Sequence, residues 1–244
     1  IIHSCMTEEI DAFGEVYLAY YRDQPSNHTT ERDDGYVRES PDAHHYFRTF
    51  DEWQKYEQEA IQEVKGRVLD IGLGAGRHSL YLQGKGYDVT GIDTSPLALE
   101  VSRLRGVKKC VLMSLHKLEF PNNSFDTVLM LGQNLALGKT DDMRAYLKRI
   151  YQITAPNGII IGEARDPSVT DNPQHLAYHE RNRQMGIHPG LVKVRVGFQG
   201  KKGEWFDLFL MDQEVLEEVI APTGWKVSKN YYSEHGKYIT VLTK

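Results

Sequence analysis

The sequence predicts an α/β fold: a doubly wound, mostly parallel sheet with helices on both faces. Two observations predict it. From residue 67 onward, short apolar runs alternate with segments of helical periodicity, which is typical of βαβ units. The first run leads directly into a glycine turn, VLDIGLGAGR at 68–77, and such turns often connect a strand to a helix that binds a ligand at its start.

The residues before this pattern form an N-terminal addition. Apolar residues recur near the helical period over 6–22 and again over 49–64, which predicts two helices. Residues 23–42 are polar and rich in Asp, Arg, Ser and Pro, so we expect a loop there. Residues 1–64 are therefore predicted to form a helical lid over the core.

The predicted core elements alternate regularly along the chain. Gly84 and Gly86 end the first core helix, and Ser95-Pro96 opens the second, because proline fits the first turn of a helix. Pro156-Asn157-Gly158 predicts a turn before the fifth strand. We expect strands at 67–71, 87–92, 109–113, 125–131 and 159–163, and helices at 76–84, 95–105 and 140–154.

The alternation is interrupted after the fifth strand, where residues 164–190 are polar and irregular. Regular patterns then return as two hairpin strands, a helix and two final strands, at 191–198, 204–211, 212–221, 225–232 and 238–243. The predicted units are a lid of residues 1–64, a core of 65–163 plus 212–244, and an insertion of 164–211.

The composition limits the classes of function. The chain has 244 residues and a net charge of −5, whereas nucleic-acid binding usually leaves a basic footprint, so we expect no nucleic-acid partner. No apolar run approaches the ~20 residues of a membrane-spanning helix, so we expect no membrane partner. Cys5 and Cys110 form no disulfide framework, which favours a reducing cytoplasm. The sequence does not decide between a monomer and a homodimer.

Gly72, Gly74 and Gly76 follow the strand that carries Asp70. Glycines let a ligand approach the backbone, and the next helix start offers unpaired N–H groups. Dinucleotide binders use the spacing G-x-G-x-x-G, but the third position here is Arg77. An acid at the strand end repels a pyrophosphate and suits a ligand with ammonium and sulfonium groups, which favours S-adenosylmethionine (SAM). The alternative is a turn that only connects strand and helix.

Asp93 follows the second core strand, 23 residues after Asp70. A carboxylate at this position can accept two hydrogen bonds from a ribose diol, or it can cap the helix that starts at Ser95-Pro96. Dehydrogenases use the same acid, so Asp93 alone does not separate SAM from a nicotinamide cofactor.

These motifs resemble those of the class I SAM-dependent methyltransferases, which have a Rossmann-like fold. VLDIGLGAGRHSLYL and GIDTSP carry the resemblance, together with the segments at 118–131, 147–164 and 211–227. It covers about 130 of the 244 residues. It implies SAM as the cofactor, S-adenosylhomocysteine (SAH) as the product, and a seven-stranded sheet in the order 3-2-1-4-5-7-6.

The resemblance also implies which residues contact the cofactor. Many relatives have an Asp after the third strand that accepts a hydrogen bond from the adenine amine. This chain has Ser114 there, a weaker acceptor, so adenine contact falls more on the backbone N–H of Leu115. The implied set is Asp70, Gly72, Gly74, Gly76, Asp93, Thr94, Ser114, Leu115, Leu131 and Gly132.

The methyl acceptor is less defined. DNA amino-methyltransferases carry an Asn/Asp-Pro-Pro-aromatic tetrad where this chain has Gly132-Gln133-Asn134-Leu135, which argues against that chemistry. Asn134 can hydrogen-bond a small acceptor, or it can contact cofactor backbone atoms and cap the next segment. Arg165 can clamp a carboxylate or phosphate, or it can pair internally with Asp166.

In addition to Asn134, three histidines are candidate catalytic residues, each as a general base. His175 and His179 are four residues apart and would share one helix face, as zinc ligands do, but the His-Glu-x-x-His pattern is absent and we predict no metal. His45, with its neighbour His44, lies in a region that relatives often fold over the cleft. The alternative for each histidine is packing or surface exposure.

We therefore predict a SAM-dependent methyltransferase of a small molecule, with residues 1–60 and 164–211 shaping the acceptor pocket. The alternatives are transfer to RNA or protein, a SAM-binding protein without catalysis, and a nicotinamide oxidoreductase. A basic groove leading to Asn134 would favour RNA, whereas a Tyr or Phe plugging the cleft would favour a protein without catalysis.

Overall fold

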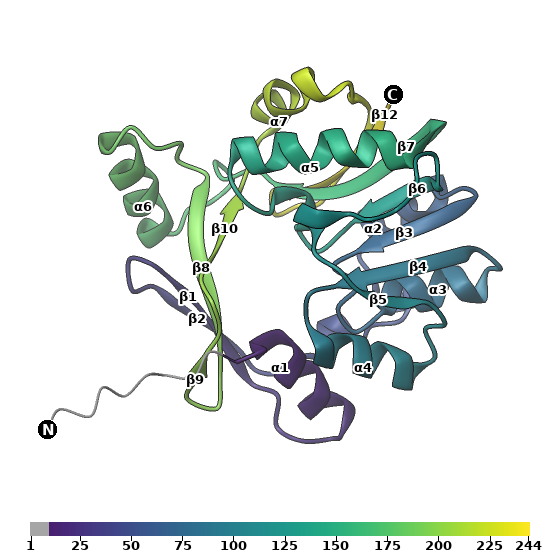
Figure 1. Ribbon diagram of the computed structural model, residues 1–244. Helices are drawn as coiled ribbons and strands as arrows, with labels where there is room; N and C mark the ends of the chain where they lie inside the picture. Colours follow the sequence, from purple (N-terminus) through teal and green to yellow (C-terminus); the bar gives the residue numbers. More distant parts are fainter. Residues whose placement is uncertain (1–9) are drawn as a thin grey trace, which may run out of the picture.

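The computed structural model describes residues 10–244, so residues 6–9 of the first predicted helix lie outside the described part of the chain. Two sheets form its frame (Figure 1). The larger sheet has seven strands in the order β11-β12-β7-β6-β3-β4-β5, and the second sheet has five strands.

Five neighbouring strands of the larger sheet run parallel: β3 (Arg67–Ile71), β4 (Asp88–Asp93), β5 (Cys110–Leu112), β6 (Phe125–Met130) and β7 (Thr154–Arg165). The last two strands are antiparallel, with β12 (Lys237–Thr243) on β7 and β11 (Lys226–Tyr232) on β12. Numbered from β3, this is the order 3-2-1-4-5-7-6, which confirms the doubly wound prediction. The carboxyl ends of all the parallel strands therefore meet at one edge.

Helices cover both faces of this sheet. On one face, α2 (Lys55–Ala60) and α3 (Arg77–Gly84) contribute Tyr56 and Leu82 to one apolar cluster. On the other, α5 (Thr140–Ile153) and α7 (Gln213–Ile220) contribute Leu147 and Leu216 to a larger one. As predicted, α4 (Pro96–Arg105) starts after Ser95, whose hydroxyl accepts a hydrogen bond from the Ala98 N–H at 2.9 Å. Every helix within residues 10–244 is too short or too polar to cross a lipid bilayer.

The N-terminal addition and the insertion together form the second sheet. Its strands are all antiparallel, with β9 (Lys201–Lys202) attached to β8 and the others in the order β10 (Phe206–Phe209), β8 (Leu191–Phe198), β1 (His28–Arg32) and β2 (Val37–Ser40). The prediction of a loop over 23–42 is therefore wrong. The central strand β1 finds its partner β8 far away in the chain, and a pairing of that kind leaves no local signal. Helix α1 (Ala12–Tyr21) precedes this sheet, and α6 (Pro173–Gln184) lies in the insertion.

Two further boundaries differ from the prediction. The helix expected over 49–64 is instead a 3₁₀ turn at Phe50–Glu52, α2 and a 3₁₀ turn at Ile61–Glu63. Trp53, with ψ 155°, is extended and separates the first 3₁₀ turn from α2. The fifth strand begins at Thr154, so the expected turn over 156–158 lies inside β7, where the register against β6 shifts.

Strand register determines which side chains of the second sheet face the core. Phe198 packs with residues of α1 and with Ala75 of the glycine turn, so its side of the sheet faces the carboxyl edge of the larger sheet. Directly opposite partners point to the same side, and so do alternate residues along a strand. Because Thr30 pairs with both Val196 and Arg38, all three share this inner face with Phe198.

Helix α1 sits directly on the start of α4. Asp11, its N-cap, accepts hydrogen bonds from the Ser95 hydroxyl at 2.7 Å and the Leu97 N–H at 3.2 Å. A Cβ at Gly14 would lie 2.5 Å from atoms of Asp11, Ser95 and Leu97. Such a distance is below van der Waals contact, so only glycine allows the two helices to approach this closely.

We predict that Gly14→Ala detaches α1 from α4. Alanine favours a helix interior by about 1 kcal/mol over glycine, so intrinsic propensity alone would stabilise α1. The overpacked contact should instead cost about 1–3 kcal/mol of unfolding free energy. Thermal unfolding and hydrogen exchange of α1 would measure this, with Glu15→Ala as the adjacent control. A Gly14→Ala protein with unchanged stability and α1 protection would contradict the close contact.

Candidate functional site

The glycine turn connects β3 to α3 at the carboxyl edge of the larger sheet. Gly72, Gly74 and Gly76 have φ of +70°, +56° and +80°, conformations that side chains other than glycine rarely adopt. The N–H groups of Gly72 and Leu73 donate to the Ile92 carbonyl of β4 at 2.9 and 3.0 Å. The turn is thus fixed by its neighbouring strand as well as by its own sequence.

The three glycines have different surroundings. A Cβ at Gly72 would overlap the Asn134 side-chain amide, and one at Gly76 would lie 2.8 Å from the Ser102 hydroxyl. At Gly74 the nearest atoms belong to the Tyr17 ring, at 3.5–3.7 Å. Gly72 and Gly76 are therefore required by the packing of the protein itself, whereas Gly74 presents bare backbone toward the lid.

Asn134 is placed against the turn. Its side-chain amide donates to the Ile71 carbonyl at 2.9 Å and the Gly72 carbonyl at 3.2 Å. Asn134 therefore holds the backbone of the turn, a role that differs from the two that the sequence leaves open.

Asp93 closes the turn from the end of β4. Its two carboxylate oxygens accept hydrogen bonds from the Gly74 and Ser95 N–H groups, each at 2.9 Å. Burial raises the pKa of Asp93, and these two hydrogen bonds oppose that rise. A carboxylate has about four acceptor positions, so each oxygen keeps capacity for a ligand hydroxyl.

Asp70 lies behind the turn. It is 3% exposed and accepts a hydrogen bond from the Ser79 hydroxyl of α3 at 2.7 Å. Burial raises the pKa of Asp70, and the hydrogen bond from Ser79 acts against it. In this structure Asp70 therefore anchors α3 to β3, whereas the sequence reasoning placed it beside a cationic ligand.

The other predicted cofactor residues lie at the ends of neighbouring strands. Thr94 is exposed after β4, and the Ser114 hydroxyl accepts from the His116 N–H at 3.2 Å in the turn that contains the buried Leu115. Leu131 is buried after β6, and Gly132 follows with φ +66° and no atom within 4 Å of a notional Cβ. Open space therefore adjoins the backbone at Gly132.

A buried carboxylate that the sequence analysis left without a role supports this end of β6. Glu163 is 2% exposed and accepts from the Gly132 N–H at 2.8 Å, and Lys237 of β12 forms an ion pair with it at 3.1 Å. Glu57 of α2 likewise pairs with Arg77 at 2.6 Å and His78 at 2.8 Å. Lys237 and Glu57 carry no motif, so only the folded structure reveals them.

His45 lies in the 3₁₀ turn His44–Tyr46, with its ring centroid 3.6 Å from that of Tyr46. One side of His45 is open to solvent. Burial of the rest of the ring, followed by the positive charges of Arg77, Lys237 and other cations, lowers the pKa of His45 to about 4. Both ring nitrogens of His44, by contrast, are bound, to the Tyr20 hydroxyl at 2.8 Å and Glu52 at 3.0 Å. Of these neighbours, only His45 keeps a ring free to accept a proton.

The other two candidate histidines lie on α6, which Figure 1 shows beside the second sheet and away from α3 and β4. His175 contacts the Thr170 hydroxyl at 3.2 Å and the Tyr36 ring edge-on at 5.2 Å. His179 is 6% exposed. The structure does not bring His179 to the glycine turn. Within residues 10–244, no group of three His, Cys, Asp or Glu side chains could hold a metal ion.

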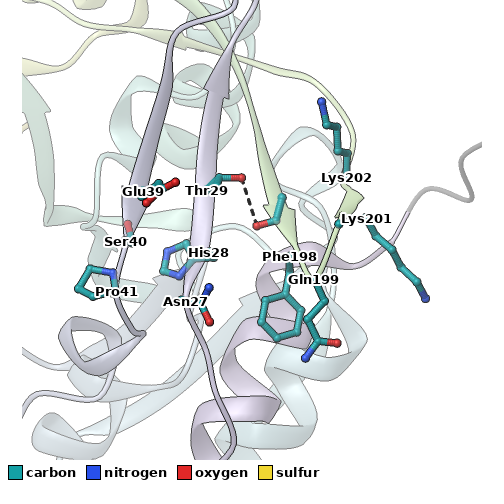
Figure 2. A pocket seen from close by; sticks show the side chains of 12 residues that line it. Asn27, His28, Thr29, Glu39, Ser40, Pro41, Phe198, Gln199, Lys201 and Lys202 are labelled. Atoms are coloured by element: carbon teal, nitrogen blue, oxygen red, sulfur yellow. Dashed lines mark hydrogen bonds between the residues drawn. The ribbon is translucent and has the colours of Figure 1, made fainter.

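A surface hollow of about 540 Å³ lies elsewhere, at one end of the second sheet (Figure 2). It is bounded by the turn before β1, the end of β2 and the β8–β9 turn, and Figure 2 shows Thr29 bonded to the Gly197 carbonyl beside it. None of the residues that line it belongs to the predicted cofactor set, so it is separate from the glycine turn.

Comparisons with known proteins agree with this geometry. Residues 69–162 match the model of a methyltransferase domain. A crystal structure of a SAM-dependent methyltransferase from Bacteroides fragilis, in complex with SAH, superposes with a TM-score of 0.81 and 27% identity, covering 96% of this chain and 94% of that one.

Curated relatives match over shorter stretches. A malonyl-[acyl-carrier protein] O-methyltransferase of Halorhodospira halophila is 33% identical over 57% of this chain, and this chain spans about half of that relative, 48%. A glycine/sarcosine N-methyltransferase of Parasynechococcus marenigrum is 34% identical over 65% of this chain and 62% of its own length. The strand order, the methyltransferase domain matched over the central strands and the similarity over nearly the whole chain to a SAM-dependent methyltransferase together show that this chain has the class I SAM-dependent methyltransferase fold.

Proposed function

We propose that this chain transfers a methyl group from SAM to a small-molecule acceptor and releases SAH. The observation that carries this proposal is the placement of Asp93 against the glycine turn, at the edge where the carboxyl ends of β3, β4 and β6 meet. In open α/β sheets, ligands bind at this edge, where the strand order reverses.

The residues at this edge fit SAM. Gly132 leaves open space beside its backbone, and a side chain there would occupy room that a cofactor needs, whereas Tyr17 covers the backbone at Gly74. Asp93 supplies acceptors for a ribose diol, and the Leu115 N–H lies at the end of the neighbouring β5 for an adenine. No phosphate-binding cation lies in the turn except Arg77, which is already paired with Glu57.

In the proposed reaction, SAM supplies a methyl group already activated by its sulfonium. The acceptor's lone pair forms the new bond to the methyl carbon, and the electrons of the broken carbon–sulfur bond remain on sulfur. The protein then contributes alignment, exclusion of water and removal of any proton from the acceptor. We assign proton removal to His45, whose ring packs against Tyr46 and whose pKa of about 4 leaves it neutral at pH 7.

The acceptor pocket in this proposal is built from the N-terminal unit 1–64 and the insertion 164–211. Their pairing into one sheet, whose inner face is directed at the carboxyl edge, supports it. The two curated relatives named above, an O-methyltransferase and an N-methyltransferase, are consistent with a small or carrier-linked acceptor. The net charge of −5 opposes a nucleic-acid acceptor.

A second candidate, a SAM-binding protein without catalysis, is favoured by one observation. Tyr17 of α1 is 5% exposed and covers the turn at Gly74. If α1 keeps this position permanently, it restricts access to the cofactor site. Methyl transfer to a product separates the two candidates, because only the enzyme turns over.

We predict that Asp93→Ala weakens SAM and SAH binding about 100-fold or more. Two hydrogen bonds to a charged group are lost, each worth about 1.5–3 kcal/mol. Isothermal titration would measure the affinity, with Asp88→Ala, at the opposite end of β4 and paired with Lys109 at the surface, as the control. Unchanged SAM affinity in a folded Asp93→Ala protein, or tight binding of NADH by the wild type, would refute the cofactor assignment.

His45 gives a pH-dependent prediction. Since its folded-state pKa is about 4 and an unfolded histidine titrates near 6.5, the unfolded state binds this proton first. The contribution of neutral His45 to stability is therefore present above pH ~6.5 and is lost as the pH falls toward 4. Histidine NMR should show one ring titrating near pH 4 that disappears in His45→Gln.

The same variant tests the role of His45 as a base. His45→Gln should lower kcat for a protonated acceptor while SAM affinity stays unchanged, and His44→Gln serves as the matched control because both of its nitrogens are already bound. Equal effects of the two substitutions on kcat would exclude His45 as the base.

The reaction itself is tested with methyl-labelled SAM and a metabolite extract. We expect label in a small-molecule fraction with the wild type and none with Asp93→Ala. Tight SAM binding without label transfer to any small molecule, RNA or protein would favour the candidate without catalysis.

A further inference from the structure

Three arginines near the proposed acceptor pocket have no partner in the protein. Most guanidinium groups are bound by carboxylates or carbonyls, as Arg77 is by Glu57. Those of Arg38, Arg48 and Arg165 form no hydrogen bond or ion pair with any residue from 10 to 244. Unpaired arginines gathered around one space are typical of sites that bind anions.

The fold directs two of these arginines toward the same region from different units. Arg38 of β2 lies on the inner face of the second sheet, in register with Thr30. Arg165 ends β7, opposite Lys237 of β12 and two residues after Glu163, so all three lie on the same side of the larger sheet. Glu163 is the residue that holds Gly132, and this side therefore adjoins the cofactor edge.

Electrostatic effects on the histidines and on Tyr46 agree with this convergence. After burial, the charges of Arg165 and Arg38 both contribute to lowering the pKa of His175. Burial raises the pKa of Tyr46 to about 12, and the positive charge of Arg38 opposes this rise. The His45 ring packs against Tyr46. After burial, the charges of Arg77, Lys237 and Arg48 contribute to lowering the pKa of His45. Arg38 and Arg165 thus both act on His175, whose ring contacts Thr170 and Tyr36, and Arg38 also acts on Tyr46, which packs against His45.

The nearby carboxylates do not neutralise this surplus. Glu57 is occupied by Arg77 and His78, and Glu163 by Lys237 and the Gly132 N–H. Glu57 thus neutralises Arg77 and Glu163 neutralises Lys237, so neither carboxylate pairs with Arg38 or Arg165. An anionic group that enters the pocket would meet two guanidinium groups, each able to form a bidentate contact.

We propose that the methyl acceptor is a small anion, and that Arg38 and Arg165 bind its carboxylate or phosphate and direct its nucleophilic atom toward His45. This inference rests on the proposed function and adds the substrate class to it. Carboxylates and phosphates share the chemistry that a guanidinium recognises, and two anion probes distinguish them.

The binding test uses the SAH-saturated protein with labelled histidines. Malonate and inorganic phosphate are titrated separately at constant ionic strength, with sodium chloride as the reference. We expect one of them to saturate and to raise the pKa of His45, because a bound anion favours the protonated ring. Arg38→Met and Arg165→Met should each weaken that binding at least tenfold, whereas Arg22→Met, which changes an exposed arginine at the end of α1, should not.

The activity test separates this inference from the proposed function. The metabolite extract is divided by anion exchange before it is incubated with methyl-labelled SAM, and we expect the labelled acceptor in the retained, anionic fraction. Label only in the unretained fraction, or anion binding unaffected by both arginine substitutions, would overturn the inference and leave the proposed function intact. Failure to bind SAH at all would overturn both.

Discussion

The pairing of β1 with β8 is the contact on which the second sheet, and with it the proposed acceptor pocket, depends. It joins His28–Arg32 to the insertion over five consecutive residue pairs, and β2 pairs with β1 while β10 pairs with β8. Without it, Arg38 would have no fixed position relative to Arg165, because one lies before the core and the other at its fifth strand. The N-terminal unit and the insertion look like separate additions in the sequence, but their strands form one sheet.

The cofactor side depends on shorter-range constraints, and for that reason much of it could be predicted. The alternation of strands and helices, the turn at 72–76 and the helix start at Ser95 are all encoded in neighbouring residues. The sheet order followed from the resemblance and agrees with the structure. Gly72 and Gly76 are glycines because Asn134 and Ser102 occupy the space of a side chain, a reason that the sequence alone does not contain.

The rest of the site could not be predicted, because its contacts join residues that carry no local pattern. The polar segment over 23–42 has the composition of a loop, yet it forms a hairpin once β8 supplies a partner. Lys237 and Glu57 look like surface residues in the sequence, but each holds a buried partner near the glycine turn or α3. His45 was one candidate among several, and only the charges around it and the bound nitrogens of His44 distinguish it.

Helix α1 connects the two sides of the site. Tyr17 covers Gly74 with one part of its ring and packs against Tyr46 with a centroid separation of 4.8 Å. Tyr46 in turn lies against His45. A ligand that binds over Gly74 must contact or displace Tyr17, and any displacement of α1 removes the packing that holds Tyr46 and His45. The proposed cofactor site and the proposed acceptor pocket thus share one aromatic contact, Tyr17 against Tyr46.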